Sequence, residues 1–432
     1  MAQRRKSSWV EPVNILLVHQ NFPGQYKHLA RIFGADTQHK VVALTMAAPV
    51  EIPGVRVIRH AWNRAKTTPH LFMTDLDQQV QRGQSTAHAA RALAQEGFYP
   101  DVILAHPGWG EALFLKDVFP KAALICFQEF FYRSSGSDVD FDPEFPKSSE
   151  LHLYHLRIRN ANILLNLDAA DANISPTAWQ RDQFPSVYRD TMALIHDGID
   201  TDAVRPNPEA WMQLARDGRR LRPGDPVVTF VNRNFEPYRG FHSFLRAVPM
   251  ILDRCPNATV ICVGGDEVSY GAQPPKGETW RSFYLRQVFG DKGPPDNLRF
   301  VGKIAYPLFL NLLQVSAAHV YLTYPFVLSW SMLEAMSAGC AVIGSNTPPV
   351  AEVIEDGENG RLVDFFSPAA IADRVCEVLE RPREFTDMRA RARQTVIDRY
   401  DLTRVCLPEH LNLIHRVTGQ GCEQTWAKGV AS

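Results

Sequence analysis

Two arginines in the middle of the chain have the spacing of a phosphate clamp. Arg233 and Arg239 follow an apolar run at 227–231, and Gly240 comes directly after the second of them. A guanidinium group can hold a phosphate through two parallel hydrogen bonds, and two such groups at a strand-to-helix turn can clamp a diphosphate. Arginines in exposed loops are more often simply solvated, so a surface role stays open. The chemistry that the pair predicts is the binding of a phosphate-bearing ligand.

A second candidate site lies in the segment 320–345, which predicts a strand, a tight loop and a helix. The β-branched, apolar run at 320–324 is typical of a buried parallel strand, and Ser329 and Ser331 are residue types that commonly begin helices. The free N–H groups and the dipole of a helix N-terminus favour an anion. Glu334 lies one turn further in, where its carboxylate can accept hydrogen bonds from a sugar diol. The alternative is an ordinary strand–helix unit with a solvated Glu334.

Two further candidates follow predicted strands in the first half of the chain. His106 comes after the predicted strand at 100–105 and opens a glycine-rich turn. Ligands of open α/β sheets bind at the carboxyl ends of strands, although a lone histidine is more often structural. Gly24 follows the apolar run at 14–18, in a loop that lacks the G-x-G-x-x-G fingerprint. A glycine there lets the backbone approach a ligand closely, and a purely structural turn is the alternative.

The order of these segments predicts an α/β protein. Short apolar strands alternate with helices, and a chain of 432 residues is too long for one ordinary core, so we expect two domains. Prolines and glycines accumulate between residues 201 and 226, and this change in composition predicts a linker. The histidine and glycine candidates then belong to the first domain, and the arginines and the glutamate to the second.

Composition and charge exclude several classes of protein. The formal net charge of −1 at pH 7 argues against a dedicated nucleic-acid binder, which would carry a basic excess. The seven cysteines form no C-x-x-C pair, so we expect reduced thiols and neither a disulfide framework nor a zinc site. No apolar run is long enough for a transmembrane helix, and the first 12 residues form a polar tail without the apolar segment of a signal peptide. We therefore expect a cytoplasmic protein.

An acidic segment at 138–146 has a superficial likeness to a calcium loop. Asp138 and Asp140 have the right spacing, but Pro143 stands where such a loop needs a glycine. We therefore predict a solvated acidic loop and no metal site.

The segment 325–345, P-F-V-L-S-W-S-M-L-E-A-M-S-A-G-C-A-V-I-G-S, resembles the signature of retaining GT-B glycosyltransferases of family 4. That signature usually reads E-G-F-G-x-x-x-x-E-A-M-A-x-G-x-P-V-[IV]. The matching residues are Glu334, Ala335, Met336, Gly339, Val342 and Ile343. The chain departs from it at the first glutamate, where it has Phe326, which cannot accept the hydrogen bonds that this glutamate takes from the donor sugar.

Other segments resemble the same family in the same order. N-R-x-x-x-x-R-G at 232–240 is similar to the family's G-R-x-x-x-x-K-G, with Asn232 in place of the first glycine and Arg239 in place of the lysine. H-x-G-W-G at 106–110 resembles the position whose histidine contacts the donor sugar. H-Q-N-F-P-G-Q at 19–25 resembles the opening of one bacterial subgroup.

The resemblance implies a set of site residues. The implied catalytic residues are His106, Arg233 and Arg239. The implied donor-binding residues are Gly24, Lys303, Ile304, Phe326, Ser329, Trp330, Ser331 and Glu334. In such enzymes the arginine pair and the helix N-terminus stabilise the departing diphosphate, the second glutamate holds the ribose, and the backbone near residues 303–304 reads the base edge. No metal is implied, because the cations take its place.

The implied fold is α/β of the GT-B type, with two facing Rossmann-like domains, parallel sheets and a cleft between them. The expected organisation is a polar tail at 1–12, an N-terminal acceptor-side domain at 13–200, a linker at 201–226, a C-terminal nucleotide-sugar-binding domain at 227–399, a helix at 400–418 that crosses back to the first domain, and a tail at 419–432.

The implied activity is retaining transfer of a sugar from a UDP- or GDP-sugar to a glycan or lipid-linked acceptor, with no cofactor, no essential metal and no nucleic acid. The implied role is the synthesis of a bacterial surface polysaccharide or glycolipid, with peripheral contact at the inner face of the membrane. Another GT-B enzyme, such as a phosphorylase, hydrolase or epimerase, is one alternative. A non-catalytic glycan-binding protein is the other, and the departures at Asn232, Arg239 and Phe326 keep it open.

Phe326 itself has two interpretations. It could line a pocket for a sugar with a less polar edge, such as a deoxy or acetamido sugar, against which an aromatic ring can pack. It could instead turn into the core, because Tyr324 and Val327 give it an apolar setting.

Overall fold

The computed structural model describes residues 12–62, 69–146, 149–214 and 218–419, which form two compact units. The first unit contains the described residues up to 134, those from 149 to 197, and those from 406 onward. The second unit contains residues 135–146 and the described part of 198–405. Each unit has its own parallel sheet, so the prediction of two Rossmann-like α/β domains is confirmed.

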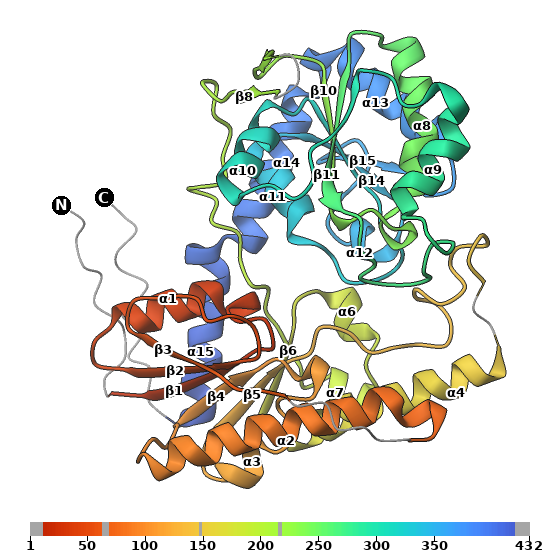
Figure 1. Ribbon diagram of the computed structural model, residues 1–432. Coiled ribbons are helices and arrows are strands. Elements are labelled where there is room, and N and C mark those ends of the chain that lie inside the picture. Colours follow the sequence, from red (N-terminus) through yellow and green to blue (C-terminus); the bar gives the residue numbers. More distant parts are fainter. Residues whose placement is uncertain (1–11, 63–68, 147–148, 215–217, 420–432) are drawn as a thin grey trace, which may run out of the picture. The chain divides into compact units, whose positions relative to one another are not determined.

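Seven parallel strands form the sheet of the first unit, in the order β3-β2-β1-β4-β5-β6-β7 (Figure 1). Their bounds are β1 Asn14–Val18, β2 Lys40–Thr45, β3 Val55–Arg59, β4 Val102–Ala105, β5 Ala123–Phe127, β6 Ala172–Ser175 and β7 Ala193–Leu194. Side chains of β1 alternate between two apolar clusters, with Ile15 and Leu17 in one and Leu16 and Val18 in the other. Burial on both sides is typical of a parallel sheet covered by helices on each face.

Helices cover both faces of this sheet (Figure 1). Their bounds are α1 Lys27–Ala35, α2 Thr74–Gln95, α3 Leu115–Val118, α4 Glu150–Arg159, α5 Ala161–Ala169, α6 Ala178–Asp182, α7 Ser186–Arg189 and α15 Leu407–Thr418. Phe33 of α1 and Leu411 of α15 belong to the apolar cluster on one face, and Leu93 of α2 belongs to the cluster on the other. The helix predicted at 400–418 begins only at Leu407, because a π-helical turn at Leu402–Cys406 precedes it.

Six parallel strands form the sheet of the second unit, in the order β12-β11-β10-β13-β14-β15. Their bounds are β10 Val227–Asn234, β11 Thr259–Gly265, β12 Leu298–Phe300, β13 Ala318–Tyr321, β14 Ala341–Ser345 and β15 Arg361–Val363. A separate antiparallel pair consists of β8 Met212–Gln213 and β9 Arg220–Leu221.

The helices of the second unit also lie on both faces of their sheet (Figure 1). Their bounds are α8 Phe241–Arg254, α9 Trp280–Phe289, α10 Tyr306–Val315, α11 Trp330–Ala338, α12 Pro348–Ala351, α13 Pro368–Glu380 and α14 Thr386–Tyr400. Met332 of α11 and Val396 of α14 pack into one core cluster, while Phe230 of β10 stacks on Phe244 of α8, with 4.4 Å between ring centroids. None of the helices within the described ranges is long and apolar enough to span a membrane.

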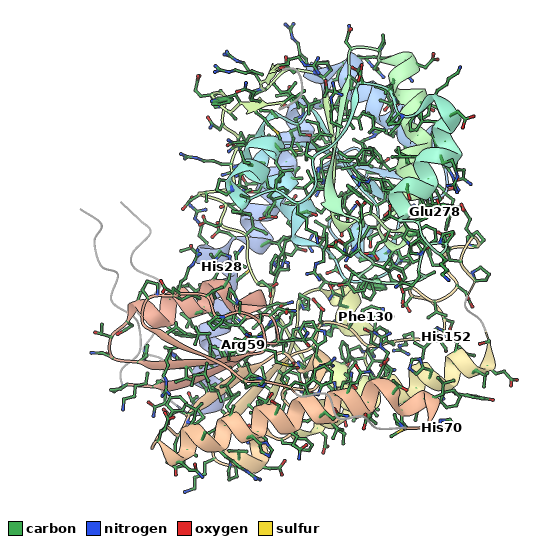
Figure 2. The ribbon with its side chains drawn as sticks, viewed as in Figure 1. His28, Arg59, His70, Phe130, His152 and Glu278 are labelled. Atoms are coloured by element: carbon green, nitrogen blue, oxygen red, sulfur yellow. The ribbon has the colours of Figure 1, made fainter. Side chains whose placement is uncertain are left out.

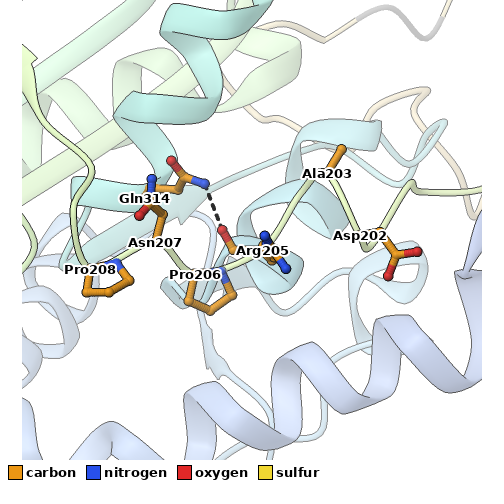
Figure 3. A pocket seen from close by; sticks show the side chains of 7 residues that line it. All are labelled: Asp202, Ala203, Arg205, Pro206, Asn207, Pro208 and Gln314. Atoms are coloured by element: carbon orange, nitrogen blue, oxygen red, sulfur yellow. Dashed lines mark hydrogen bonds between the residues drawn. The ribbon is translucent and has the colours of Figure 1, made fainter. Parts of the chain in front are cut away.

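The described part of the segment predicted as a linker, 201–226, is packed instead. Val204, Leu214 and Leu221 are buried in the core of the second unit, and β8 and β9 lie within the segment. Its prolines and glycines therefore serve turns inside one unit. Part of it lines a surface hollow of about 600 Å³ together with Gln314, which donates to the Arg205 carbonyl oxygen at 2.8 Å (Figure 3). Gln314 lies near the end of α10, at the amino end of β13, so this hollow is not where ligands of such sheets bind.

The second unit also contains a segment from the first half of the chain. Residues 135–146, which we call the strap, come between β5 and α4 of the first unit but belong to the second. The prediction of a solvated acidic loop is wrong, because Asp138 and Asp142 are 7% and 1% exposed. The domain predicted at 13–200 is therefore interrupted by a piece that packs elsewhere.

Candidate functional site

In the second unit the candidate residues gather at the carboxyl ends of β10 and β13. These strands are neighbours, but the sheet continues from β10 to β11 on one side and from β13 to β14 on the other. Such a reversal opens a crevice beyond the strand ends, where ligands of open α/β sheets bind. Arg233 and Arg239 lie at the end of β10, and the loop 322–329 follows β13. The topology thus brings the arginine pair and the start of α11 to one place.

Arg239 is buried and braces the loop that follows β13. After it Gly240 takes φ 68°, which places it against Leu322, where a side chain would collide. The Nη1 atom of Arg239 donates to Thr323 Oγ1 and to the Val327 carbonyl oxygen, both at 2.9 Å. The guanidinium group has three further N–H donors. Arg239 therefore joins the two loops of the crevice and has donors beyond those two bonds.

Arg233, by contrast, is exposed at the end of β10. Between the two arginines, Glu236 is buried, and its Oε2 atom accepts the backbone N–H groups of Ser269 (3.0 Å) and Tyr270 (2.8 Å). Burial raises the pKa of Glu236, while the Tyr270 N–H and the charge of Arg239 act in the opposite direction. Glu236 thus connects the turn between Arg233 and Arg239 to the loop after β11. The spacing of the arginines did not predict this role.

The helix α11 begins at Trp330 with Ser329 as its N-cap, as predicted. Ser329 Oγ accepts the Ser331 N–H at 3.4 Å, and the Ser329 N–H donates to the Tyr321 hydroxyl at 2.8 Å. Gly339 ends the helix in the left-handed conformation, with φ 87°, which confirms the predicted C-cap. The first N–H groups of α11 therefore lie at the end of the loop after β13, where a helix can bind an anion.

Glu334 is buried in α11 and hydrogen-bonded to a tyrosine. The Tyr306 hydroxyl donates to Glu334 Oε1 at 2.7 Å. Burial and the neighbouring carboxylate raise the pKa of Tyr306, so this hydroxyl keeps its proton. The alternative of a solvated Glu334 is wrong, and the sequence gave no sign of Tyr306. A carboxylate has two oxygens with several acceptor positions, so the bond to Tyr306 is compatible with a diol ligand.

Phe326 packs into an aromatic cluster. Its buried ring lies edge-on to Tyr238 (5.4 Å between centroids) and Tyr270 (4.9 Å). The Arg239 guanidinium lies 5.8 Å from the ring centroid, within reach of a cation–π interaction. This packing favours the interpretation in which Phe326 turns into the core of its loop.

Lys303 and Ile304 follow β12, and their side chains are engaged elsewhere. Lys303 Nζ lies 2.8 Å from Glu267 Oε2, and this hydrogen bond lowers the pKa of the exposed Glu267 carboxyl. Ile304 packs against the apolar core of the unit. The side chains of both residues therefore have partners within the second unit.

In the first unit three polar side chains follow adjacent strands. β1, β4 and β5 are neighbours, and His19, His106 and Glu129 come at their carboxyl ends. The strand order reverses between β1 and β4, so this is the crevice of the first sheet. His106 is 2% exposed, its ring stacks on Trp109 with 4.5 Å between centroids, and the His19 ring lies 5.2 Å away. The predicted residue His106 therefore belongs to a cluster.

Hydrogen bonds fix the positions of the hydrogen atoms on both rings. His19 Nδ1 accepts the Asn21 N–H (3.0 Å), so Nε2 carries the hydrogen and donates to Gln25 Oε1 (2.7 Å). Burial, and next the neighbouring His106, lower the pKa of His19 to about 3, so its ring is neutral. His106 Nδ1 accepts the Gly108 N–H at 3.3 Å, which leaves the hydrogen of the neutral ring on Nε2.

Gly24 is explained by its contact with His19. It takes φ 45°, and a side chain at this position would collide with the His19 ring. This packing favours the structural alternative, in which the glycine lets the loop close over His19.

Glu129 completes the cluster and was not among the predicted residues. Gln25 Nε2 donates to Glu129 Oε1 at 3.1 Å, and Glu129 Oε2 lies 3.8 Å from His106 Nε2. The backbone carbonyl of Glu129 accepts from Gln180 Nε2 at 2.6 Å, and the next residue, Phe130 (labelled in Figure 2), is buried. The glutamate is thus held from both its side chain and its backbone. The sequence offered one sign of this role, because Glu129 is a polar residue that comes just after a predicted buried strand.

Glu111 is a buried carboxyl group in the same glycine-rich turn as His106. It is 1% exposed, and neither carboxylate oxygen accepts a hydrogen bond from another described residue. Burial raises the pKa of Glu111 to about 7, with the charges of Arg82 and His106 acting in the opposite direction. Such a carboxyl group is poised to change its charge near neutral pH.

The strap holds two tyrosines beside the crevice of the second unit. The Tyr238 hydroxyl donates to Asp138, and the Tyr324 hydroxyl donates to Asp142 Oδ2 at 2.6 Å. The two rings stack with 4.5 Å between centroids. Tyr238 directly precedes Arg239, and Tyr324 lies in the loop that Arg239 braces. The strap therefore holds both loops of the crevice in place.

One group of described residues, Asp142, Glu144 and His242, has the composition of a metal site. Asp142 Oδ2 already accepts from Tyr324 and lies 3.0 Å from His242 Nε2. Glu144 forms an ion pair with Arg246 through both carboxylate oxygens. A metal ion would compete with the protons and the guanidinium group that already bind these oxygens. These residues are therefore better explained as polar contacts that attach the strap to α8 and to the loop after β13 than as a metal centre.

Two family models match consecutive parts of the chain. Residues 37–204 match the model of the glycosyl transferase family 4 group, and residues 213–395 match that of the glycosyl transferases group 1. The gap between the two matches, at residues 205–212, comes shortly after Gly198, where the chain enters the second unit for the second time.

Curated relatives match about half of the chain. A GDP-mannose-dependent alpha-(1-6)-phosphatidylinositol monomannoside mannosyltransferase of Mycobacterium tuberculosis is 29% identical over 222 residues, which are 49% of this chain and 53% of the relative. A D-inositol 3-phosphate glycosyltransferase of Streptomyces coelicolor is 25% identical over 229 residues, or 50% of this chain and 49% of the relative. The chain thus spans about half the length of these curated relatives.

Solved structures match nearly the whole chain. The Anabaena protein HepE, solved in complex with UDP-glucose, has a TM-score of 0.64 at 13% identity, over 93% of this chain and 99% of its own. Sucrose-phosphate synthase from Thermosynechococcus elongatus has a TM-score of 0.67 at 17% identity, over 95% and 100%. At these identities the likeness shows the fold.

Proposed function

Because the chain belongs to the family 4 glycosyltransferases of the GT-B fold, we propose that it transfers a sugar from a nucleotide-sugar to a hydroxyl group of a glycan or lipid-linked acceptor. The observation that carries the proposal is the convergence of Arg233, Arg239 and the N-terminus of α11 at the carboxyl ends of β10 and β13. Cationic and N–H donors at such a crevice suit a diphosphate.

The reaction is retaining transfer. The acceptor oxygen forms a bond to the anomeric carbon, the bond from that carbon to the diphosphate breaks, and the hydroxyl proton leaves with the diphosphate. Arg233, Arg239 and the α11 N-terminus stabilise the negative charge that grows on the departing group. Glu334 accepts hydrogen bonds from the ribose. The two arginines and the N-terminus of α11 take the place of a metal ion, so the enzyme needs no metal.

His106 contacts the donor sugar, as the resemblance of H-x-G-W-G implies. Its Nδ1 atom accepts the Gly108 N–H, so its Nε2 atom offers an N–H group. The two relatives are named for phosphatidylinositol monomannoside and for inositol 3-phosphate, and these names support a lipid-linked or polyol acceptor. The biological role that we propose is the assembly of a bacterial surface polysaccharide or glycolipid.

A panel of nucleotide-sugars tests the proposal on the full chain. Melting temperatures are measured with UDP-, GDP- and ADP-sugars, and nucleotide release is then followed with and without glycan and glycolipid acceptors, in EDTA. We expect one class of nucleotide to raise the melting temperature and nucleotide release to need an acceptor, with activity retained in EDTA.

Each alternative has its own outcome in the same panel. Release without acceptor indicates a hydrolase, release that depends on inorganic phosphate indicates a phosphorylase, and binding without turnover indicates a non-catalytic protein. A strict requirement for added Mn²⁺ or Mg²⁺ contradicts the metal-independent mechanism.

A further inference from the structure

We propose that His106 and Glu129 together form a binding site for one hydroxyl group of a neutral sugar or polyol. This inference rests on the proposed function and adds to it a residue, Glu129, that the family signature does not contain. It also defines the chemistry of the ligand at the crevice of the first sheet, which is hydroxyl-bearing and not phosphate-bearing.

The donor half of the site is the Nε2–H group of His106. Gly108 N–H occupies Nδ1, so the hydrogen of the neutral ring is on Nε2. Nε2 is buried and makes no hydrogen bond to the described part of the chain. A buried donor without a partner costs free energy, so its presence points to a ligand that completes it.

The acceptor half is Glu129 Oε2, which lies 3.8 Å from His106 Nε2. This distance is too long for a hydrogen bond, but one oxygen atom that lies to the side of both groups can be within hydrogen-bond distance, about 2.8 Å, of each. A hydroxyl oxygen can accept from the imidazole N–H and donate to the carboxylate at the same time, and a carboxylate oxygen can accept more than one hydrogen bond. A phosphate oxygen carries negative charge and no hydrogen, so the carboxylate repels it.

The position of Glu129 is fixed by a relay of hydrogen bonds. Asn21 N–H donates to His19, His19 Nε2–H donates to Gln25, and Gln25 Nε2–H donates to Glu129 Oε1. The direction of each hydrogen bond in this relay is fixed. Because Nδ1 of His19 accepts the Asn21 N–H, Nε2 must donate to Gln25 Oε1, and the Gln25 amide group must then donate to Glu129. The relay aligns the carboxylate before a ligand arrives, which lowers the entropic cost of binding.

The charges around the pair agree with a neutral ligand. His19 is neutral, since burial and the nearby His106 lower its pKa to about 3. Glu111 is a buried acidic group that interacts with His106, and Arg82 interacts with Glu111 and donates from Nη1 to the Trp109 carbonyl oxygen at 3.3 Å. The proposed function assigns the hydroxyl to the donor sugar, and a hydroxyl of the acceptor is the other source that the test distinguishes.

The test compares the full-length wild type with Glu129→Gln, using the donor and acceptor that the panel identifies. Single deoxy analogues of the donor sugar form one arm, and single deoxy analogues of the acceptor form the other. We expect Glu129→Gln to lower kcat/KM roughly 10- to 100-fold, as for the loss of one charge-assisted hydrogen bond. The affinity for the nucleoside diphosphate alone should stay within about twofold. One deoxy analogue should cost the wild type a similar factor and cost the variant little.

Glu96→Gln is the matched control, because it removes an exposed carboxylate of the same unit, which pairs with Arg56 at 2.6 Å. Unchanged kinetics and an unchanged analogue ranking in Glu129→Gln overturn the inference while the wild type still turns over. A wild type that neither binds nor uses any nucleotide-sugar overturns the proposed function instead. Where Glu129→Gln fails to fold, the wild-type analogue panel decides, since the inference is wrong if no single deoxy analogue loses about tenfold.

Discussion

At the scale of single residues, the two arginines of one motif have different environments and therefore different expected roles. Arg233 is exposed, whereas Arg239 is buried and bound to Thr323 and Val327. A substitution of Arg233 should therefore remove a ligand contact, and a substitution of Arg239 should also loosen the loop after β13.

We predict that Arg233→Ala lowers kcat roughly 30- to 1,000-fold, by analogy with the loss of one oxyanion donor. Its melting temperature should match the wild type, because an exposed side chain on a sheet end contributes little to stability. Arg383→Ala, which removes another exposed arginine of the second unit, is the control for the change in charge. Near-wild-type turnover in Arg233→Ala would exclude the assigned role.

Glu111 supports a prediction about stability and pH. Its folded pKa is about 7 against an ordinary 4.5, so the unfolded chain releases this proton at lower pH than the folded chain does. Stability therefore falls as pH rises from about 4.5 to about 7, by an amount on the order of 3 kcal/mol from this group. We expect the melting temperature of Glu111→Gln relative to the wild type to increase by several degrees between pH 5 and pH 8. A difference that does not change with pH would contradict the raised pKa.

At the scale of elements, the strap acts on the loops that carry the candidate residues. Asp142→Asn keeps the size of the side chain but weakens the bond from Tyr324 and the contact with His242. We expect a lower melting temperature and weaker nucleotide binding, because a buried charged hydrogen bond contributes about 1.5–3 kcal/mol. Thermal shift and nucleotide titration measure both effects.

Glu144→Gln is the matched control on the same strap. Its pairing with Arg246 is partly exposed, so its loss should cost about 1 kcal/mol or less. An Asp142→Asn variant with wild-type stability and nucleotide affinity would show that the strap does not position the loops. Loss of stability in EDTA would show instead that Asp142, Glu144 and His242 hold a metal ion.

Local patterns in the sequence predicted the elements but not the contacts between distant polar residues. The apolar runs predicted the central strands, and Ser329 and Gly339 marked both ends of α11, because each depends on neighbours a few residues away. The pairs Gln25–Glu129 and Tyr324–Asp142 join residues 104 and 182 positions apart. Nothing in an acidic, proline-bearing segment distinguishes a buried strap from a solvated loop until its distant partners are known.

At the scale of the whole molecule, a set of buried neutral histidines predicts sensitivity to acid. Burial lowers the pKa of each of them, to about 3 for His19, His196 and His319 and to about 4 for His60 and His410. The unfolded chain binds protons at these sites from about pH 6.5 downward. Their contribution to stability is therefore complete above pH 6.5 and is lost as pH falls toward 3–4.

We expect the melting temperature to fall steeply between pH 6.5 and pH 4, and the fold to be lost before pH 3, since total stability is about 5–15 kcal/mol. Circular dichroism melts across this range measure the trend. A melting temperature that stays constant down to pH 4 would mean that protonation of these histidines does not lower the free energy of unfolding, which would contradict their lowered pKa values.

The strap also determines how this chain can be recombined with its relatives. The chain passes from one unit to the other after residues 134, 146, 197 and 405, so no single cut separates the two units. A chimera joined near residue 200 would take its strap from one parent and Tyr238 and Tyr324 from the other. Carboxylate and tyrosine would then meet only if both parents carry them at these positions. Exchange of the whole second unit between relatives therefore requires transplanting 135–146 as an insertion together with 198–405.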